Sequence, residues 1–580
     1  MTGIDLILII PSVQPVISAS QMREIDRLTT ANHQIPSIEL MQAAADACFR
    51  AIGSHFADNL KDKRGLILCG QGNNGGDGAA LAQLLFNADV VVDVVLFGNL
   101  EGTHGDARIN FEKVKHLSEA ASSSPSSSLN PASISFSEFE EPSSWQQFNY
   151  RERTYDVVVD ALFGTGLSRP LEGVFSEVVD DLKPPAPDSN SLPERPLIVS
   201  IDIPSGLNAD SAKPIGPAIQ ADLTVTFTAP KLANVLPPAS DLNGKLIVAD
   251  IGSPRSLIEA TNPNLFVNEA GDARDWLVRT RYTPNSFKNT HGHVLVVAGS
   301  PGFTGAAVLC GNAAMRSGAG LVTIATPASA QAAVAGQVMA EVMTTALAET
   351  DRGAVSDEAT EHLRRLASKA TVIAVGPGLT SEDERTRRFV YSVVKNRTTP
   401  IVIDADGLNC LVLDSGGWPQ DLQGSAKAPL ILTPHAGEML RLLGTADKSV
   451  LNDRVAVARD FAVRNQLLLV LKGSRTLLAG PDGRVIINPT GNAGLGTAGS
   501  GDTLTGLISG FIAQDAATLG EASDALSATL AALFVGGLAG DLAARKLGMR
   551  TMLASDIREH FGEAIRTLDP EGEEVDTTTR

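Results

Sequence analysis

The sequence predicts an α/β protein of two domains, each built on a parallel β-sheet with helices on both faces. Three observations support this fold class. The chain has 580 residues, which is too long for one hydrophobic core, since domains typically hold about 100–200 residues. Short apolar runs rich in Val, Ile and Leu alternate with helix-length segments, as in parallel sheets that are buried on both faces. Aromatic residues make up only 4% of the chain, so the cores must be formed mainly by aliphatic side chains.

The apolar runs place the strands in order along the chain. In the first half the expected strands are Leu66–Cys69, Val90–Phe97, Asp156–Leu162, Leu197–Ile203, Leu223–Thr228 and Lys245–Asp250. In the second half they include Val294–Ala298, Leu321–Ala325, Val372–Val375, Ile401–Asp404, Leu430–Leu432 and Leu467–Leu471. The break between the two sets predicts an N-terminal domain over residues 1–255, a linker over 256–274 and a C-terminal domain over 275–580.

Two stretches rich in Ser and Pro interrupt the first half, at Leu117–Ser144 and Pro184–Pro196. Such a composition cannot form a hydrophobic core, so we expect both stretches to be insertions on the surface. Deleting Ser122–Ser137 is then expected to have little effect on stability, because surface loops tolerate changes in length.

Charge and cysteine content narrow the range of functions. The 47 basic and 66 acidic residues give a net charge of −19, which repels phosphate backbones, so no nucleic-acid partner is expected. The four cysteines lie far apart and include no Cys-x-x-Cys pair, so buried free thiols are expected. The first ten residues lack the basic segment of a signal peptide and the length of a membrane span. The sequence therefore predicts a soluble cytoplasmic protein with no membrane partner.

A glycine loop follows the first strand. Residues Gly70–Gly75 satisfy the pattern Gly-x-Gly-x-x-Gly, which lets the backbone approach a phosphate at the start of the next helix, here expected near Gly78. The pattern is weak on its own, because a glycine-rich turn without a ligand looks the same. A dinucleotide site also needs an acidic residue at the end of the second strand. The candidate, Asp93, lies inside Val90–Phe97, where we expect it to be buried.

Polar residues at two further strand ends strengthen the case for a site. Asp160 ends the third strand and is followed by the loop Gly164–Gly166, while Asp202 ends the fourth and is followed by Ser205. Ligands of open α/β sheets bind at the carboxyl ends of the strands. A single aspartate at a strand end often only caps a turn. It is much rarer for three such segments to lie at the same edge of a sheet by chance.

The three segments, NNGGDG, DALFGTGL and DIPSGL, resemble the signature segments of the NAD(P)H-hydrate epimerase family over roughly residues 20–255. The resemblance implies a Rossmann-like three-layer αβα domain that inverts the hydroxyl-bearing C6 of hydrated NADH or NADPH (NADHX and NADPHX). It implies a K⁺ ion held by Asn74, Asp160 and Ser205. It also implies hydrate binding by Asn73, Asn74, Gly75, Gly76, Asp77, Gly164, Thr165, Gly166, Leu167, Ser168, Arg169, Pro170 and Asp202. A carboxylate at Asp202 can move protons during the inversion, and Lys231 is a second candidate.

In the second half, Gly499-Ser500-Gly501-Asp502 precedes a long apolar helical pattern. Small residues at a helix N-terminus leave N–H groups that stabilise negative charge, and the aspartate can act on a hydroxyl beside them. A glycine and an aspartate before a helix can equally form a cap alone. Four further loops follow strands, however, at Gly299–Ala307, Val375–Leu379, Thr433–Glu438 and Lys472–Thr476. No Walker pattern is present in the sequence.

This set resembles the NAD(P)H-hydrate dehydratase branch of the ribokinase-like superfamily over roughly residues 275–570, which implies a ribokinase-like αβα domain. The resemblance implies hydrate contacts at Ala306, Gly378, His435 and Asp502. It implies contacts with an adenine nucleotide at Lys472, Gly473, Ser474, Arg475, Thr476 and Gly501. Asp502 would take the proton of the C6 hydroxyl as that oxygen attacks the terminal phosphoryl group, and loss of phosphate would restore the ring. Mg²⁺ is expected with the nucleotide, and ADP is favoured over ATP.

Together the two halves predict a bifunctional enzyme, an isomerase and a lyase, that repairs hydrated nicotinamide cofactors and that is expected to form a homo-oligomer. One alternative is a sugar or hydroxymethylpyrimidine kinase fused to an NAD-dependent first half. An NAD site would need an acidic residue at the end of the second strand, and the sequence has none there. Another alternative is a first half that binds without catalysing. For His435 the alternative is a purely structural histidine.

Overall fold

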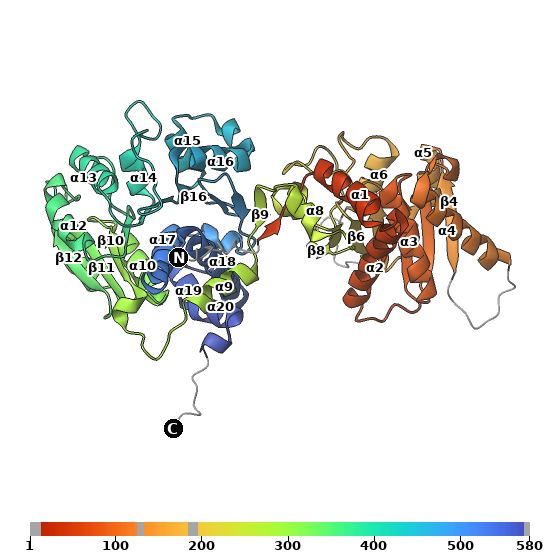
Figure 1. Cartoon of the computed structure of the whole chain (residues 1–580). Helices are drawn as coiled ribbons and strands as arrows, with labels where there is room; N and C mark the ends of the chain where they lie inside the picture. The colour runs from red at the N-terminus through yellow and green to blue at the C-terminus, as the bar shows by residue number, and fades with distance from the viewer. Residues whose placement is uncertain (1–12, 124–132, 184–194, 574–580) are drawn as a thin grey trace, which may run out of the picture. The chain divides into compact units, whose positions relative to one another are not determined.

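The structure is a computed structural model that describes residues 13–123, 133–183 and 195–573. It divides into two compact units, Pro15–Pro263 and Asn264–Arg580, the second of which also includes the segment that ends at Gln14. Each unit is an α/β domain with its own sheet (Figure 1). The expected linker over 256–274 contains the end of α8 (Arg255–Ala260), β9 (Leu265–Val267) and the start of α9 (Ala270–Arg279). The functional boundaries at 255 and 275 stay a prediction.

The sheet of the N-terminal unit is parallel throughout, in the order β4-β3-β2-β5-β6-β7-β8. Its strands are β2 (Arg64–Cys69), β3 (Val91–Phe97), β4 (Ile134–Phe139), β5 (Val157–Ala161), β6 (Leu197–Ile201), β7 (Leu223–Phe227) and β8 (Lys245–Ala249). Its helices are α1 (Ala19–His33), α2 (Ser37–His55), α3 (Asn73–Asn87), α4 (Gly105–Ser123), α5 (Pro142–Phe148), α6 (Val174–Leu182), α7 (Leu232–Val235) and α8. Along β2, Ile67 and Cys69 join an apolar cluster with α2–α4, whereas Leu66 and Leu68 join one with α5 and α6. Helices therefore cover both faces, which confirms the expected three-layer domain.

The sheet of the C-terminal unit has the order β1-β9-β18-β17-β16-β15-β14-β13-β10-β11-β12. Its other strands are β1 (Gln14–Pro15), β10 (His293–Val297), β11 (Leu321–Pro327), β12 (Met343–Leu347), β13 (Val372–Val375), β14 (Ile401–Ile403), β15 (Leu430–Leu432), β16 (Leu468–Leu471), β17 (Leu477–Ala479) and β18 (Val485–Ile487). β17 pairs antiparallel with β16 and with β18, so this sheet is mixed.

The helices of the C-terminal unit lie on both sides of its sheet. They are α9, α10 (Thr304–Arg316), α11 (Ala328–Ala335), α12 (Thr360–Ala367), α13 (Glu384–Lys395), α14 (Asp406–Leu411), α15 (Ala436–Leu443), α16 (Arg454–Asn465), α17 (Ser500–Leu519), α18 (Ala525–Leu547), α19 (Ala554–Glu559) and α20 (Phe561–Leu568). Figure 1 shows α13–α16 on the opposite side of the sheet from α10, α17 and α18. The expected αβα arrangement is confirmed.

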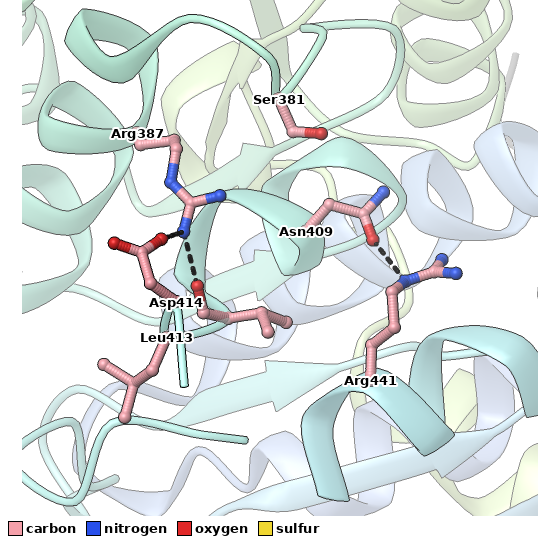
Figure 2. Close-up of a pocket in the computed structure, with 7 residues that line it drawn as sticks. Ser381, Arg387, Asn409, Leu413, Asp414 and Arg441 are labelled. Carbon is pink, nitrogen blue, oxygen red and sulfur yellow. Dashed lines mark hydrogen bonds and ion pairs between the residues drawn. The ribbon is translucent and has the colours of Figure 1, made fainter. Parts of the chain in front are cut away.

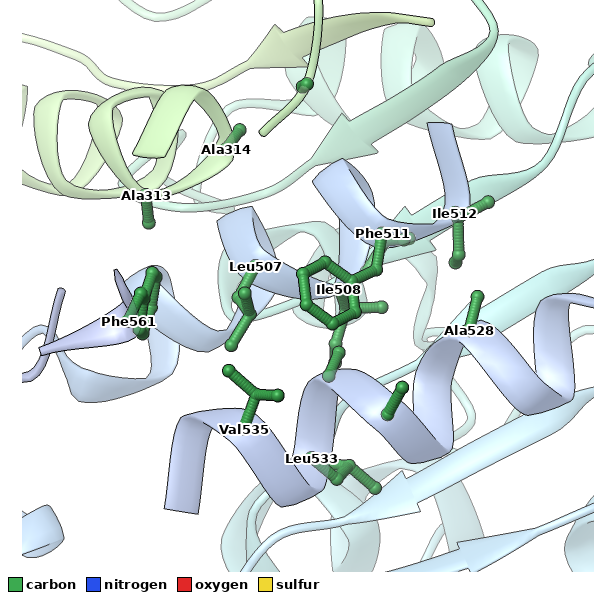
Figure 3. Close-up of a cluster of buried hydrophobic side chains, with 14 of the residues drawn as sticks. Ala313, Ala314, Leu507, Ile508, Phe511, Ile512, Ala528, Leu533, Val535 and Phe561 are labelled. Atoms are coloured by element: carbon green, nitrogen blue, oxygen red, sulfur yellow. The ribbon is translucent and has the colours of Figure 1, made fainter. Parts of the chain in front are cut away.

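Close packing of α10, α17 and α18 forms the core of this unit (Figure 3). Two glycines of α17 permit the approach to α10. A Cβ atom at Gly506 would lie 2.2 Å from the carbonyl oxygen of Cys310, and one at Gly510 would lie 1.8 Å from Ser317 Oγ, so neither position accepts a larger residue. This contact fixes the N-terminus of α17, where Asp502 lies.

Among the described residues, α18 is the one helix long and apolar enough to cross a membrane. Of its most apolar window of residues, 67% are buried inside the protein, as in a core helix that is apolar all round. The expectation for the first ten residues lies outside the part of the chain that the structure describes.

Every strand expected from the sequence is present, with small shifts at the ends. The four cysteines are buried free thiols, as predicted. The expectation for Leu117–Ser144 is wrong in part, because residues 134–139 form the edge strand β4, which pairs with β3. Ile134 is buried in the core, and Ser135 donates a hydrogen bond to Asp93, which is half-buried rather than buried. The alternation Ile-Ser-Phe-Ser-Glu-Phe is a strand pattern that the overall Ser and Pro content obscures. Residues 124–132 and 184–194 lie outside the described residues.

Deleting Ser122–Ser137 is therefore no longer expected to be harmless, because it removes residues 134–137, four of the six residues of β4. A milder test is Ile134→Ala. Ile134 is 3% exposed and packs with Phe111 and Val114, so the free energy of unfolding should fall by about 2 kcal/mol, the lower end for a truncated core isoleucine. Denaturant unfolding measures this, with the exposed neighbour Ser133→Ala as the control. A loss no larger than that of the control would show that β4 is not packed on the domain.

Candidate active sites

The glycine loop after β2 brings the start of α3 to the carboxyl end of the N-terminal sheet. A Cβ atom at Gly70 would lie 2.1 Å from the carbonyl oxygen of Leu162, and one at Gly75 would lie 1.8 Å from that of Gly70. No larger residue fits this turn. The helix begins at Asn73, earlier than expected, and no side chain caps it, so its first N–H groups are available to an anionic ligand.

Asp160 is a fully buried carboxylate in β5. Its Oδ2 accepts hydrogen bonds from Ser200 Oγ and from the backbone N–H of Ser205, both at 2.8 Å, and its Oδ1 accepts one from Ser205 Oγ at 2.5 Å. Burial raises the pKa of Asp160, and these hydrogen bonds oppose the rise by favouring the ionised form. Within the described residues, the groups that lower this pKa are hydrogen-bond donors and include no basic side chain. A buried carboxylate without a basic partner is a place where a cation would compensate the charge.

The expected metal ligands gather around Phe163 and Gly164. The N–H of Phe163 donates to Ser205 Oγ at 2.9 Å, and the carbonyl of Phe163 accepts from the same hydroxyl at 3.2 Å. Asn74 Oδ1 lies 3.1 Å from the place that a Cβ would occupy at Gly164, while Asn74 Nδ2 is buried and has no hydrogen-bond partner among the residues that the structure describes. Amide, carboxylate and hydroxyl oxygens suit a hard cation, so Asn74, Asp160 and Ser205 fit K⁺ by their chemistry.

Asp202 and Lys231 form a buried ion pair, with side chains that are 12% and 1% exposed. Lys231 Nζ donates to Asp202 Oδ1 at 2.7 Å, to Thr226 Oγ1 at 3.0 Å and to the carbonyl of Phe227 at 3.1 Å. These bonds occupy all three N–H groups of the ammonium, so Lys231 has none left for a substrate. The second oxygen of Asp202, Oδ2, lies 3.4 Å from the position of a Cβ at Gly164 and so faces the next loop.

The loop Gly164–Pro170 is partly or fully exposed and is held at two points. Asn208 Nδ2 donates to the carbonyl of Leu167 at 3.0 Å, and a Cβ at Gly216 would lie 2.8 Å from Pro170 Cβ. The other expected contacts of this loop are Thr165, Gly166, Ser168 and Arg169. The three segments singled out in the sequence therefore meet at one edge of the sheet.

Asp502, in the first turn of α17, lies in the second candidate site. Burial is the largest of the causes that raise the pKa of Asp502 to about 7. The negative charge of Asp404 adds to the rise, and the positive charge of Lys472 opposes it. A carboxyl group with such a pKa exchanges its proton readily near neutral pH. The arrangement can remove a proton from a hydroxyl group placed beside it.

Asp404 and Lys472 form the ion pair beside Asp502. Lys472 Nζ lies 2.5 Å from Asp404 Oδ1, and Thr505 Oγ1 donates to Asp404 Oδ2 at 2.8 Å. Burial acts to raise the pKa of Asp404, but Lys472 and the hydrogen bonds outweigh it and lower that pKa. A Cβ at Gly501 would lie 3.3 Å from Lys472 Nζ. Lys472 and Gly501, both expected at the nucleotide, therefore lie side by side.

The loop Lys472–Thr476 is held by Arg454. Arg454 Nη1 donates to the carbonyl of Ser474 at 2.8 Å, and Nη2 donates to that of Leu471 at 3.3 Å. Gly473 has φ +151°, and a Cβ there would lie 2.9 Å from Arg454 Nη2, so glycine is required. Arg475 has φ +54° and donates to the carbonyl of Pro489.

His435 and the pair Ala306–Gly378 complete the second site. His435 is the N-cap of α15, and its Nδ1 accepts from the N–H groups of Gly437 and Glu438 at 3.0 and 3.4 Å. His435 therefore has a structural role as the cap of α15. Its side chain is 56% exposed, so it can also contact a ligand, and the expected contact with the hydrate stays a prediction. A Cβ at Gly378 would lie 3.1 Å from Ala306 Cβ, so these two expected contacts are neighbours.

A surface pocket in the C-terminal unit contains none of the expected site residues (Figure 2). It has a volume of about 540 Å³ and is lined by Ser381, Arg387, Asn409, Val412, Leu413, Asp414 and Arg441. Arg387 donates to the carbonyl of Val412 and to Asp414, and Arg441 donates to Asn409. Both guanidinium groups are therefore already engaged within the protein.

Sequence reasoning missed several polar residues of the two sites. Asp404 follows β14 just as Asp202 follows β6, so the strand-end argument could have found it. Glu438 lies in TPHAGE and accepts the N–H of His435 at 2.8 Å; a capping-box pattern predicts this bond. Asp26 of α1 is far from every motif in the sequence. Burial raises the pKa of Asp77, and the negative charges of Asp202 and Asp26 raise it further. No local signal marks Asp26.

Comparison with known proteins assigns both halves. Residues 37–233 match the family model described as "YjeF-related protein N-terminus", and residues 294–562 match the one described as "NAD(P)H-hydrate dehydratase". The bifunctional NAD(P)H-hydrate repair enzyme Nnr of Moorella thermoacetica is 39% identical over 561 residues, which cover 97% of this chain and 98% of the relative. That of Escherichia coli is 32% identical over 535 residues, covering 92% and 90%.

Solved structures match the C-terminal half. The ADP/ATP-dependent NAD(P)H-hydrate dehydratase from Bacillus subtilis, co-crystallised with ATP and Mg²⁺, is 29% identical with a TM-score of 0.41, covering 50% of this chain and 96% of its own. A ribokinase-like superfamily protein from Enterococcus faecalis is 23% identical with a TM-score of 0.43, covering 53% and 96%. From the two family models and the relatives that span nearly the whole chain, we conclude that the chain belongs to the family of bifunctional NAD(P)H-hydrate repair enzymes.

Proposed function

We propose that this chain repairs hydrated NADH and NADPH in two steps. The N-terminal unit interconverts the R and S forms of NADHX or NADPHX at C6, and the C-terminal unit dehydrates the S form to NADH or NADPH. The observation that carries the proposal is the relative of 39% identity that spans 97% of the chain, because it pairs both activities in one polypeptide. The chemistry agrees, since hydration yields two epimers and a dehydratase selective for one needs an epimerase. A cytoplasmic location and a homo-oligomer stay expectations.

In the epimerase step Asp202 is the proton-transfer group. Its Oδ1 is fixed by Lys231 and Thr226, and its Oδ2 is directed at the loop Gly164–Pro170, which we propose binds the hydrate together with Asn73–Asp77. Inversion at C6 requires proton transfer to and from oxygen. Lys231 positions Asp202 and does not itself exchange a proton, because its three N–H groups are used.

K⁺ would be held by Asn74, Asp160 and Ser205. When bound, it supplies positive charge beside the hydrate and compensates the buried carboxylate of Asp160. Asn74 is also the second residue of α3, which links the cation to the loop that we propose binds the hydrate.

Asp160→Asn should remove the dependence of epimerisation on K⁺, because it keeps the shape of the side chain and removes the charge that the ion compensates. In the parent protein, replacing K⁺ with a bulky organic cation should slow epimerisation and lower the melting temperature, since an ion that binds only the folded state stabilises it. Both effects should be absent in the variant. A parent whose rate and melting temperature are indifferent to the cation would rule out the site and leave Asp160 as a cap.

In the dehydratase step Asp502 takes the proton of the C6 hydroxyl, and that oxygen attacks the terminal phosphoryl group of the nucleotide. The N–H groups at Ala498–Gly501 stabilise the negative charge, and Lys472 lies beside Gly501 at the nucleotide. Loss of phosphate then breaks the C6–O bond while a proton leaves C5, which restores the ring double bond. The products are NADH or NADPH, phosphate and the shortened nucleotide.

The nucleotide is proposed to be ADP, which gives AMP, and Mg²⁺ would neutralise its phosphates. Within the described residues no group of three or more His, Cys, Asp or Glu side chains is arranged to hold a metal. This agrees with Mg²⁺ held chiefly by phosphate oxygens and water. The test of the proposed function is recovery of NADH absorbance from hydrated NADH, with ADP, ATP and no nucleotide compared in parallel. No recovery with either nucleotide would refute it.

A further inference from the structure

Helix α1 is anchored to both loops that carry Asp202 and Lys231. The N–H of Ala19 donates to Asp210 Oδ1 at 2.8 Å in the loop after β6, and the N–H of Ile17 donates to the carbonyl of Pro230, next to Lys231, at 3.0 Å. Apolar packing reinforces both bonds. Met22 and Ile25 of α1 cluster with Ala229, and Ala19 clusters with Ile203 and Ala233. The inner face of α1 therefore covers the carboxyl ends of β6 and β7.

This inner face carries polar atoms without partners. Asp26 Oδ1 is buried and has no hydrogen-bond partner within the described residues, although the residue as a whole is only half-buried. One turn further on, Thr29 is 0% exposed, and its hydroxyl likewise has no hydrogen-bond partner in the described part of the chain. Buried polar groups without partners destabilise a fold, so two of them on the helix that covers the ion pair point to a ligand or a proton rather than to packing.

The charged groups around Asp26 belong to the first site. Burial raises the pKa of Asp26 to about 6, while Lys231 lowers it and Asp202 raises it. The charge of Asp26 acts in turn on Asp77 of α3. Asp202 is ion-paired and accepts two hydrogen bonds, whereas Oδ1 of Asp26 accepts none. The two carboxyl groups therefore differ in their surroundings: one is held by an ammonium group and a hydroxyl, and the other has a buried oxygen that is open to a ligand.

We propose that Asp26 is a second catalytic residue of the epimerase site and exchanges protons with the substrate as the partner of Asp202. This inference rests on the proposed epimerase function. It assigns a role to a residue outside the three segments that the sequence singled out.

The step needs both groups. Protonated Asp26 gives its proton to the C6 hydroxyl, the C6–O bond breaks, water leaves and the lone pair of N1 forms a C=N bond with C6. Water then adds to the opposite face of C6, its electron pair forms the new C–O bond, and Asp202 accepts its proton. The proton has moved from Asp26 to Asp202, and in the reverse direction the two residues exchange roles. The R-to-S step therefore begins with the proton on Asp26.

Asp26→Asn in the full chain should lower the rate of R-to-S conversion by about 10²–10⁴-fold, the usual effect of losing one acid–base group. The R-to-S rate of the parent should fall as the pH rises through about 6, where Asp26 loses the proton that it must donate, and the residual rate of the variant should lack this fall. The melting temperature at pH 7.5 should not fall. The folded protein keeps the Asp26 proton up to about pH 6, above the ordinary 3.8, so the ionised group weakens the fold at neutral pH and asparagine removes that effect.

The matched control is Glu24→Gln on the same helix, since Glu24 is exposed and its ion pair among the described residues is with Arg27. It should epimerise at the parent rate, and both variants should dehydrate the S form normally. Asp26→Glu, which restores a proton-carrying group, should recover part of the rate.

Epimerisation by Asp26→Asn within threefold of the parent, or a slow variant that keeps the fall in rate near pH 6 or melts lower, would overturn the inference while the proposed function stands. A parent protein that does not interconvert the epimers faster than buffer would refute the proposed function itself, and the inference with it.

Discussion

Replacing Asp502 with asparagine should lower the rate of dehydration of the S form by about 10²–10⁴-fold while the rate of epimerisation stays unchanged. The reason is local. Asp502 lies beside Gly501 and Lys472 at the start of α17, and asparagine keeps its size but cannot accept the hydroxyl proton. The two activities are measured on one preparation, dehydration from S-NADHX with nucleotide and epimerisation from R-NADHX without it. The control Glu521→Gln changes an exposed acid after α17 and should leave both rates unchanged.

The same residue predicts a pH dependence. Asp502 must be ionised to act as a base, and its pKa is about 7. The kcat/KM of dehydration should therefore rise with pH up to about 7 and level off above it. Near-normal turnover of Asp502→Asn, or a rate that falls as the pH rises through 7, would remove Asp502 from the mechanism as the base.

The second large effect is expected at Asp202. Asp202→Asn should lower epimerisation by about 10²–10⁴-fold and leave the dehydration of the S form intact. It should also destabilise the N-terminal unit by about 3–5 kcal/mol, because it leaves the ammonium of Lys231 buried without its carboxylate partner.

A double variant separates the two effects. Asp202→Asn combined with Lys231→Met removes both charges, so it should recover most of the free energy of unfolding and none of the epimerisation. Denaturant unfolding and the epimerase assay measure the two quantities on the same proteins. A double variant that regains epimerase activity would show that Asp202 acts only through the fold.

The positions of the strand ends predicted that most residues proposed for each site would lie together, because parallel strands end at one edge of their sheet. Their roles in binding and catalysis stay predictions. Asp160 lies near the end of β5, and Asp202 and Ser205 follow the neighbouring strand β6, so their meeting could be anticipated from the positions of the apolar runs alone. The same reasoning explains why every expected strand is present. Asp404 also lies at the end of a strand, directly after β14. It was not predicted as a site residue because no motif surrounds it.

What could not be predicted depends on tertiary packing. Asp26 joins the first site because α1 lies over the loops after β6 and β7, and no pattern near residue 26 encodes that contact. Strand β4 was missed because its alternating pattern is short and lies within a Ser-rich stretch. The orientation of Lys231, with three acceptors around Nζ, comes from residues 202, 226 and 227 together and has no signature in the sequence.

The most direct test of two separate sites in one chain is chiral separation of the hydrate that remains when a mixture of R- and S-NADHX is incubated with ADP and Mg²⁺. The parent should convert nearly all of it to NADH. Asp202→Asn should consume the S form and leave the R form to decline close to its spontaneous rate. Asp502→Asn should form very little NADH in the same time and bring the two forms to equilibrium. If Asp202→Asn consumed both forms at equal rates, the assignment of epimerisation to the N-terminal unit would be contradicted.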